Sequence, residues 1–315
     1  MANSNKVELV TISDSAEGQR LDNFLITRLK GVPKSMIYRI IRKGEVRVNK
    51  GRAKPERKLQ VGDVVRVPPV RMAEGKAPAL ASDGLKHLLA DSVLYEDSAL
   101  MVVNKPSGLA VHGGSGISLG LIESLRQMAG ENSYLELVHR LDRETSGCVL
   151  VAKKRPMLKY LQALFRLDGK GKQIDKQYLA LVKGRWPNRA NFVDVPLQKN
   201  ELQSGERIVR VSLEGKASKT AFSVNRRYEL ATLVNASPIT GRTHQIRVHA
   251  QSKGHPLVGD DKYGDDEFNK LMKQAGCRRL FLHAASLAFS LPDGTPLKVE
   301  APLPDELQTV LTNLE

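Results

Sequence analysis

The sequence predicts an α+β protein that is divided into two domains. Short strand-like runs such as residues 148–154 and 231–238 are mixed with helical patterns, without the regular alternation of a doubly wound parallel sheet. The 315 residues exceed the usual size of one domain. Residues 69–87 hold prolines and glycines without periodicity, which is typical of a linker. We therefore expect a small domain over 1–68, a linker over 69–87 and a larger domain over 88–315.

Composition and cysteine usage predict a cytoplasmic protein. Hydrophobic residues make up 41% of the chain and charged residues 26%, as in a protein with a packed core. No uncharged apolar run reaches membrane-spanning length, and the first ten residues lack the basic-then-apolar order of a signal peptide. The two cysteines, Cys148 and Cys277, lie far apart, which favours reduced thiols over a disulfide framework or a zinc site.

The charge of the chain favours a polyanionic partner. The formal net charge is +15, which suits a nucleic acid or an acidic membrane surface. Residues 16–70 hold 14 basic and 5 acidic side chains, so +9 of the surplus lies in this small segment. The position of the surplus therefore indicates that the first domain makes the contact.

Two short helices are expected in this basic segment. Residues 21–29 carry apolar side chains at helical spacing and are followed by Gly31, which favours a helix end. Residues 34–43 carry a second apolar face, with Pro33 before it and Gly44 after it. The opposite side of the second helix is basic.

A small strand pair follows the two helices. Val46 and Val48 alternate into an Asn-Lys-Gly turn. Lys50 stands where a glycine directly after the asparagine is commoner, so we expect a turn that is one residue longer. Residues 34–58 carry ten positive charges and two negative ones, whereas a merely solvated face usually mixes both signs.

The strings "RLDNFL" and "SMIYRIIRKGEVRVN" resemble the alpha-L, or S4-like, RNA-binding module over residues 18–68. The resemblance implies binding to structured RNA through the basic helical face. The cations that would make this contact are Lys34, Arg39, Arg42, Lys43 and Arg47.

In the larger region, Asp142 lies between Arg140 and Arg143 in "LVHRLDRETSGCVLVAKK". This carboxylate is either a reactive group held in its charged form or a turn residue with a surface ion pair. A kinase catalytic loop is excluded, because no Gly-rich loop with a strand lysine precedes it and the metal-binding Asn is absent. Glycoside hydrolysis usually needs two opposed carboxylates, and Glu144 lies too near along the chain to be an obvious second one.

A second polar string, "TGRTHQIRVHAQSKGHP", contains the best partner for Asp142. Thr243 is a plausible N-cap and Gly254 a plausible stop, so Arg247 falls near the first turn of a short helix. A cation there opposes the helix dipole unless an anion lies close by. Asp142 would supply that anion and would itself be kept ionised, although Arg247 could also point at solvent or at phosphate.

Two further features of this region have alternative interpretations. His244 and His249 are five residues apart, without a carboxylate, so they are better explained as hydrogen-bonded structural groups than as a zinc pair. Strand alternation places Tyr178 on the same face as Ala180 and Val182. A strand tyrosine is usually a core or interface residue, and its alternative use is a flat surface on which an extruded base stacks.

Taken together, the motifs resemble those of the pseudouridine synthases that act on large-subunit ribosomal RNA. The resemblance covers nearly the whole chain. Its motifs are "NKPSGLAVH" at 104–112, "HRLDRETSG" at 139–147, "YLALVKG" at 178–184, "GRTHQIRVH" at 241–249 and "LHA" at 282–284. It implies a mixed, mainly antiparallel sheet flanked by helices, and isomerisation of flipped-out uridines without cofactor or metal.

The resemblance also implies roles for single residues. Asp142 matches the catalytic aspartate, which acts as a nucleophile or as a base, and Arg247 matches the arginine that pairs with it. Tyr178 matches the aromatic residue that stacks on the uracil. Arg140 matches an arginine that fills the gap left by the flipped base or contacts its phosphate. Leu282 packs beneath the base or is simply a core leucine.

Several alternatives stay open at this point. A noncatalytic RNA-binding factor for ribosome assembly and a base-removing hydrolase are the competing functions. A monomer is expected, because nothing in the chain demands a partner subunit. The sequence does not identify the uridines, and residues 166–176 form either an RNA-contacting loop or a flexible connection.

Overall fold

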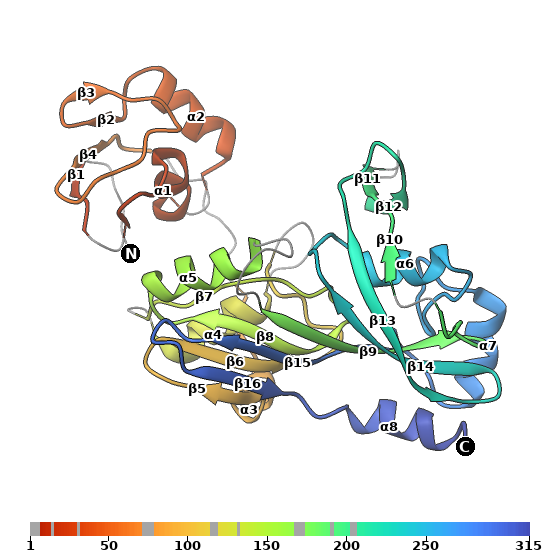
Figure 1. The fold of residues 1–315 in the computed structure, drawn as a ribbon. Helices are drawn as coiled ribbons and strands as arrows, with labels where there is room; N and C mark the ends of the chain where they lie inside the picture. The colour runs from red at the N-terminus through yellow and green to blue at the C-terminus, as the bar shows by residue number, and fades with distance from the viewer. Residues whose placement is uncertain are drawn as a thin grey trace. The chain divides into compact units, whose positions relative to one another are not determined.

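The computed structural model describes residues 7–13, 16–29, 32–70, 79–113, 119–130, 133–166, 174–189, 192–201 and 207–315 (Figure 1). The chain forms two compact units, Met1–Pro78 and Ala79–Glu315. Helix α3, Asp83–Asp91, begins inside the predicted linker 69–87. The irregular segment therefore ends before residue 83 and not at residue 87. Gly31 and most of the 166–176 segment, residues 167–173, lie outside the described residues.

The first unit packs two helices against a small sheet. Its strands have the order β1-β4-β2-β3, and its elements are β1 Glu8–Thr11, α1 Leu21–Arg28, α2 Lys34–Arg42, β2 Arg47–Val48, β3 Gly51–Arg52 and β4 Val64–Val67. The predicted apolar faces form its core: Leu21, Leu25, Ile37, Ile40 and Val48 are all nearly inaccessible to solvent. The two helices that the spacing predicted are therefore present, and Gly44 follows α2 with a φ of 74°.

The turn between β2 and β3 differs from the expectation. Val48 pairs directly with Gly51, so the loop holds two residues, Asn49 and Lys50, and is not one residue longer. Both have positive φ, 51° and 67°, as a two-residue hairpin loop with the right twist requires. Lys50 thus adopts the left-handed conformation in place of the commoner glycine, at a cost of about 1 kcal/mol.

The second unit is built on a ten-stranded mixed sheet. Its main order is β10-β13-β14-β9-β15-β8-β6-β5, with β16 beside β15 and β7 beside β8. The only parallel pair among the described strands is β8 with β15, so the predicted mixed, mainly antiparallel sheet is confirmed. The strands are β5 Val93–Glu96, β6 Leu100–Lys105, β7 Glu136–Leu137, β8 Ser146–Ala152, β9 Asp175–Lys183, β10 Phe192–Asp194, β13 Lys219–Arg227, β14 Ala231–Pro238, β15 Leu282–Ser290 and β16 Pro296–Glu300, and a separate pair is β11 Leu197–Glu201 with β12 Arg207–Val211.

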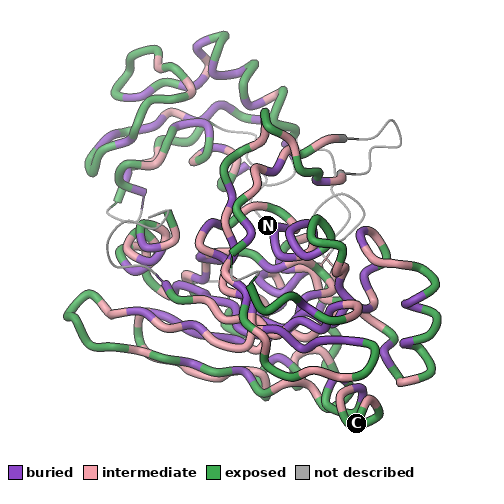
Figure 2. Tube along the Cα trace, turned by 45° about the vertical axis from the view of Figure 1, so that its right-hand side comes forward, coloured by how far each residue is buried: buried purple, intermediate pink, exposed green. Residues whose placement is uncertain are grey.

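Helices cover both faces of this sheet. In one half, α5 packs on the face of β6 that bears Leu100 and Val102, and α3 and α4 pack on the face that bears Met101 and Val103. In the other half, α6 covers one face and α7 and α8 cover the other. The helices are α4 Leu121–Ala129, α5 Arg155–Arg166, α6 Gln245–Ser252, α7 Asp266–Gln274 and α8 Asp305–Thr312. The central strands are accordingly buried along much of their length (Figure 2).

Strand β9 joins the two halves. As predicted, Ala180 and Val182 lie on the same face as Tyr178, and Leu181 lies on the other. Tyr178 packs against the apolar clusters of both halves. It therefore stands at the centre of the sheet, where segments from both halves meet.

No helix within the described ranges has both the length and the apolar character needed to cross a bilayer. The twelve-residue α5, for comparison, is shorter than the roughly 20 residues that a membrane span requires.

Candidate active site

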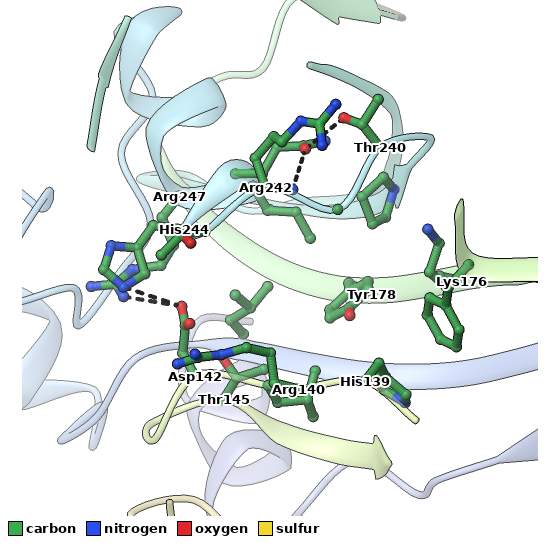
Figure 3. Close-up of a pocket in the computed structure, with 18 of the residues that line it drawn as sticks. His139, Arg140, Asp142, Thr145, Lys176, Tyr178, Thr240, Arg242, His244 and Arg247 are labelled. Carbon is green, nitrogen blue, oxygen red and sulfur yellow. Dashed lines mark hydrogen bonds and ion pairs between the residues drawn. The ribbon is translucent and has the colours of Figure 1, made fainter. Parts of the chain in front are cut away.

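A cavity of about 300 Å³ opens above Tyr178. It is lined by the loop that precedes β8, by the end of α5, by the start of β9 and by residues 238–247. Asp142 and Arg247 lie at one end, and Lys176 and His139 lie at the other, with Tyr178 between them (Figure 3). All five predicted residues of the larger domain, namely Arg140, Asp142, Tyr178, Arg247 and Leu282, line this one cavity.

Lys105, the lysine of the "NKPSG" motif, is hydrogen-bonded to the loop that carries Asp142. Its ammonium group is inaccessible to solvent and donates to the carbonyl oxygens of Pro106, Leu109 and Arg143 at 2.8, 2.8 and 2.9 Å. Burial lowers the pKa of Lys105 to about 7, but the three acceptors match the three N–H donors of the charged form. Lys105 therefore ties the loop of Asp142 to the end of β6.

Gly147, at the start of β8, allows β8 and β15 to lie unusually close. Its φ is 108°, and a Cβ atom at this position would lie 2.2 Å from the carbonyl oxygen of Ala284. Since β15 is hydrogen-bonded to both β8 and β9, this contact sets the loop of Asp142 beside Tyr178.

The predicted ion pair between Asp142 and Arg247 is present. Arg247 Nη1 donates to Asp142 Oδ2 at 3.3 Å, and the side chains are 11% and 21% exposed. Arg247 does lie in the first turn of α6, but Thr243 is not the N-cap. That position is taken by His244, with a φ of 52° and no side-chain capping hydrogen bond. Nearby, Gln245 Oε1 accepts the Arg242 backbone N–H.

Asp260 is a site residue that sequence reasoning missed. Its fully buried carboxylate accepts Arg247 Nε and Nη2, both at 2.7 Å, and also accepts the backbone N–H groups of Lys262 and Tyr263. Burial alone would raise the pKa of Asp260, but the hydrogen bonds and charge of Arg247 outweigh it and lower that pKa. A signal was available, since Asp260 follows the apolar run "PLVG" directly.

Tyr263 and His244 complete the surroundings of the ion pair. The Tyr263 hydroxyl accepts Val209 N–H at 2.9 Å and forms a hydrogen bond of 2.7 Å with His244 Nδ1. The other ring nitrogen, His244 Nε2, lies 3.8 Å from Asp142 Oδ2. Burial lowers the pKa of His244, although the charge of Asp142 opposes this shift.

His244 and His249 are both hydrogen-bonded to neighbouring side chains. His249 is hydrogen-bonded to Ser218 and Thr220, as expected for a structural residue. Across the ranges that the structure describes, no group of three or more His, Cys, Asp or Glu side chains is arranged to hold a metal ion.

The remaining predicted residues occupy distinct places. Burial raises the pKa of Tyr178, so the ring is a neutral, flat surface in the cavity. Leu282 is only 4% exposed, belongs to the core and also lines the cavity. Arg140 is exposed at the cavity wall. The five predicted RNA-binding cations, Lys34, Arg39, Arg42, Lys43 and Arg47, are exposed on α2 and the strand that follows.

The fold and this arrangement of residues agree with the comparisons to known proteins. The RNA pseudouridylate synthase family matches residues 99–252, and the S4 domain matches residues 19–65. The chain belongs to the RNA pseudouridylate synthase family, as the sequence motifs led us to expect.

Individual relatives support this assignment over nearly the full length. The chain is 57% identical to ribosomal large subunit pseudouridine synthase C of Pasteurella multocida over 97% of this chain and 93% of that protein. It is also 57% identical to the protein of the same name from Escherichia coli K12, over 98% and 97% of the two chains. Among solved structures, human RNA pseudouridylate synthase domain containing 4 aligns with a TM-score of 0.59 and 30% identity, over 73% of this chain and 95% of that one.

Proposed function

We propose that the protein isomerises uridines to pseudouridines in large-subunit ribosomal RNA, with Asp142 as the catalytic carboxylate. The observation that carries the proposal is the pairing of Asp142 with a buried arginine directly beside the neutral ring of Tyr178, in one cavity. The names of the relatives support ribosomal RNA as the substrate.

The reaction requires a flipped-out nucleotide. Isomerisation breaks the bond between C1′ and N1, joins C5 to C1′, removes the proton from C5 and leaves one on N1. These atoms are not accessible inside a helical stack, so the uridine must enter the cavity at a cost of a few kcal/mol. The conversion involves no net redox change and no transferred group, so its stoichiometry calls for no cofactor.

Asp142 acts as an ionised carboxylate. Attack on the sugar, attack on the base and removal of a sugar proton all need a negative oxygen held near C1′. Arg247 donates to Oδ2 and is itself fixed by Asp260, which supports an oriented anion at this place.

The other cavity residues bind the substrate. The Tyr178 ring stacks on the uracil, Leu282 packs beneath it, and Arg140 contacts the RNA at the rim. Because the cavity excludes most water when it is filled, the detached uracil is recaptured and not lost to hydrolysis. The proposal also takes the protein to act as a monomer in the cytoplasm, because nothing in its sequence demands a partner subunit or a membrane span.

The N-terminal unit provides additional affinity for RNA. Its exposed cations, Lys34, Arg39, Arg42, Lys43 and Arg47, would each neutralise a phosphate. Uridine selection then depends on RNA shape and on access to the cavity.

A map of pseudouridines in ribosomal RNA tests the function directly. Cells with and without this protein are compared position by position, and we expect defined large-subunit pseudouridines to disappear without it. An unchanged map would contradict the proposal and favour a noncatalytic assembly factor, and release of free uracil by the purified protein would favour a hydrolase.

A further inference from the structure

The cavity continues past Tyr178 to an aromatic and cationic end. Phe165, at the end of α5, stacks on His139 with ring centroids 4.6 Å apart and an interplanar angle of 24°. Lys176 Nζ lies 5.6 Å from the centroid of the same Phe165 ring. Figure 3 shows His139 and Lys176 on the opposite side of Tyr178 from Asp142. We call Phe165, His139 and Lys176 the aromatic end.

Charge at this end suits a phosphate. Of the described residues that line the cavity, Arg140, Lys176, Arg242 and Arg247 are Arg or Lys, and Asp142 is the one Asp or Glu. Asp142 pairs with Arg247 at one end of the cavity, and Lys176 is the cation at the aromatic end. A phosphate placed at the aromatic end would therefore lie near the Lys176 ammonium.

The two rings of the aromatic end, Phe165 and His139, are uncharged, and the His139 ring is held in place by a hydrogen bond. His139 Nε2 accepts the Leu150 N–H at 3.0 Å, which fixes the ring, and burial lowers the pKa of His139 to about 3, which keeps it neutral. Phe165 rests on this fixed ring. A stacked pair of neutral rings is the kind of surface on which nucleic-acid bases stack without sequence preference.

The spacing along β9 relates the aromatic end to the target uridine. Lys176 and Tyr178 are two residues apart on the strand, so they share one face with about 7 Å between their Cα atoms. A uracil stacked on Tyr178 therefore places the neighbouring phosphate within reach of the long Lys176 side chain.

We propose that the aromatic end is a binding subsite for the nucleotide adjacent to the target uridine, with its base on Phe165 and its phosphate on Lys176. This inference rests on the proposed function. In the free protein the Lys176 ammonium lies over the Phe165 ring. When RNA binds, the phosphate draws the ammonium aside and the base takes its place on the ring.

The test combines protein variants with altered RNA. The RNA probe is a short strand that spans a uridine which the wild-type protein converts, with an abasic nucleotide introduced on one side or the other. We expect an abasic neighbour on one side to lower kcat/KM of the wild-type protein by about 5- to 150-fold, the range for one stacked base. Phe165→Ala should show the same loss on intact RNA and no further loss on the abasic strand, whereas Phe165→Trp should retain activity.

Lys176 is tested through salt dependence. The slope of log affinity against log salt is negative. Lys176→Gln should make it shallower by about 0.7 to 0.9, the value for one lost phosphate contact. Lys159→Gln is the matched control, because Lys159 lies on the exposed side of α5 and does not line the cavity. An equal change in slope for both variants would contradict the role of Lys176.

The outcomes separate the two proposals. A wild-type protein that forms no pseudouridine on any strand overturns the proposed function. An active wild-type protein that is indifferent to abasic neighbours on both sides, or losses from Phe165→Ala and from the abasic strand that multiply, overturns the subsite alone. If Phe165→Ala does not fold, the abasic strands with the wild-type protein and with Lys176→Gln still decide the matter.

Discussion

At the scale of single residues, the site depends on which carboxylates accept hydrogen bonds from the three guanidinium nitrogens of Arg247. Nε and Nη2 bind the buried carboxylate of Asp260, and Nη1 binds Asp142. The fork of a guanidinium is planar, so fixing two of its nitrogens fixes the direction of the third. Asp260 thereby orients the cation that orients the Asp142 carboxylate, to which we assign catalysis.

We expect Asp260→Asn to lower turnover strongly while RNA affinity is largely retained. Removing one partner of a buried ion pair also destabilises a fold by about 3 to 5 kcal/mol, because the other charge is left without compensation. Turnover on ribosomal RNA and a urea unfolding curve measure the two effects. Asp261→Asn, at the exposed neighbour, is the control and should leave both unchanged. Wild-type turnover in Asp260→Asn would show that Arg247 is oriented by other contacts.

Buried neutral histidines give the stability a defined pH dependence. The pKa of His139 falls from 6.5 to about 3 on burial, and burial also lowers the pKa values of His249 and His283. Below pH 6.5 the unfolded chain binds protons that the folded chain does not, so the free energy of unfolding must fall as the pH decreases toward 3. Each such histidine contributes at most about 1.4 kcal/mol per pH unit.

Urea unfolding at pH 7.5 and pH 5.5 checks this prediction. We expect lower stability at pH 5.5, and a smaller difference between the two pH values for His139→Gln, which cannot titrate. A difference of the same size in this variant would mean that His139 is not the source.

At the scale of elements, the parallel contact of β8 with β15 positions the loop that carries Asp142. Gly147→Ala would put a Cβ atom against the Ala284 backbone, so we expect weaker β8–β15 pairing, a lower melting temperature and reduced turnover. Gly294→Ala is the control, because Gly294 also has positive φ but has no atom within 4 Å of the added carbon. Equal melting temperatures for the two variants would show that backbone strain, and not the close approach, governs the effect.

The elements also show how far sequence reasoning extends. The two helices of the first unit followed from apolar spacing, because local periodicity determines which face is buried. The first part of helix α3, residues 83–87, was expected in the linker, because the prolines and glycines of that segment masked the pattern. Ser82 nevertheless caps the helix by accepting Leu85 N–H. Asp142 and Arg247 could be paired from charge logic. Asp260 was missed, because Asp142 already met the need for an anion near Arg247, and the position of Asp260 directly after "PLVG" was not used as a signal.

At the scale of the whole molecule, the division into an RNA-binding unit and a catalytic unit is a proposal that truncation tests. The fragment Ala79–Glu315 has its own buried clusters, so we expect it to fold and to show a cooperative melting transition by circular dichroism. Its RNA affinity should be weaker and its salt dependence shallower, because the cations of α2 are removed. A fragment that does not fold would contradict independent domains, and unchanged affinity would contradict the role of the first unit.

The most direct test of the central claim is pseudouridine formation by Asp142→Asn on protein-free large-subunit ribosomal RNA. The substitution keeps the size of the side chain but removes its charge and its nucleophilic oxygen. We predict RNA affinity close to that of the wild-type protein, with no detectable conversion of uridine. Conversion at a near-normal rate would contradict the account, because the ionised oxygens that Arg247 binds would then have no part in the chemistry.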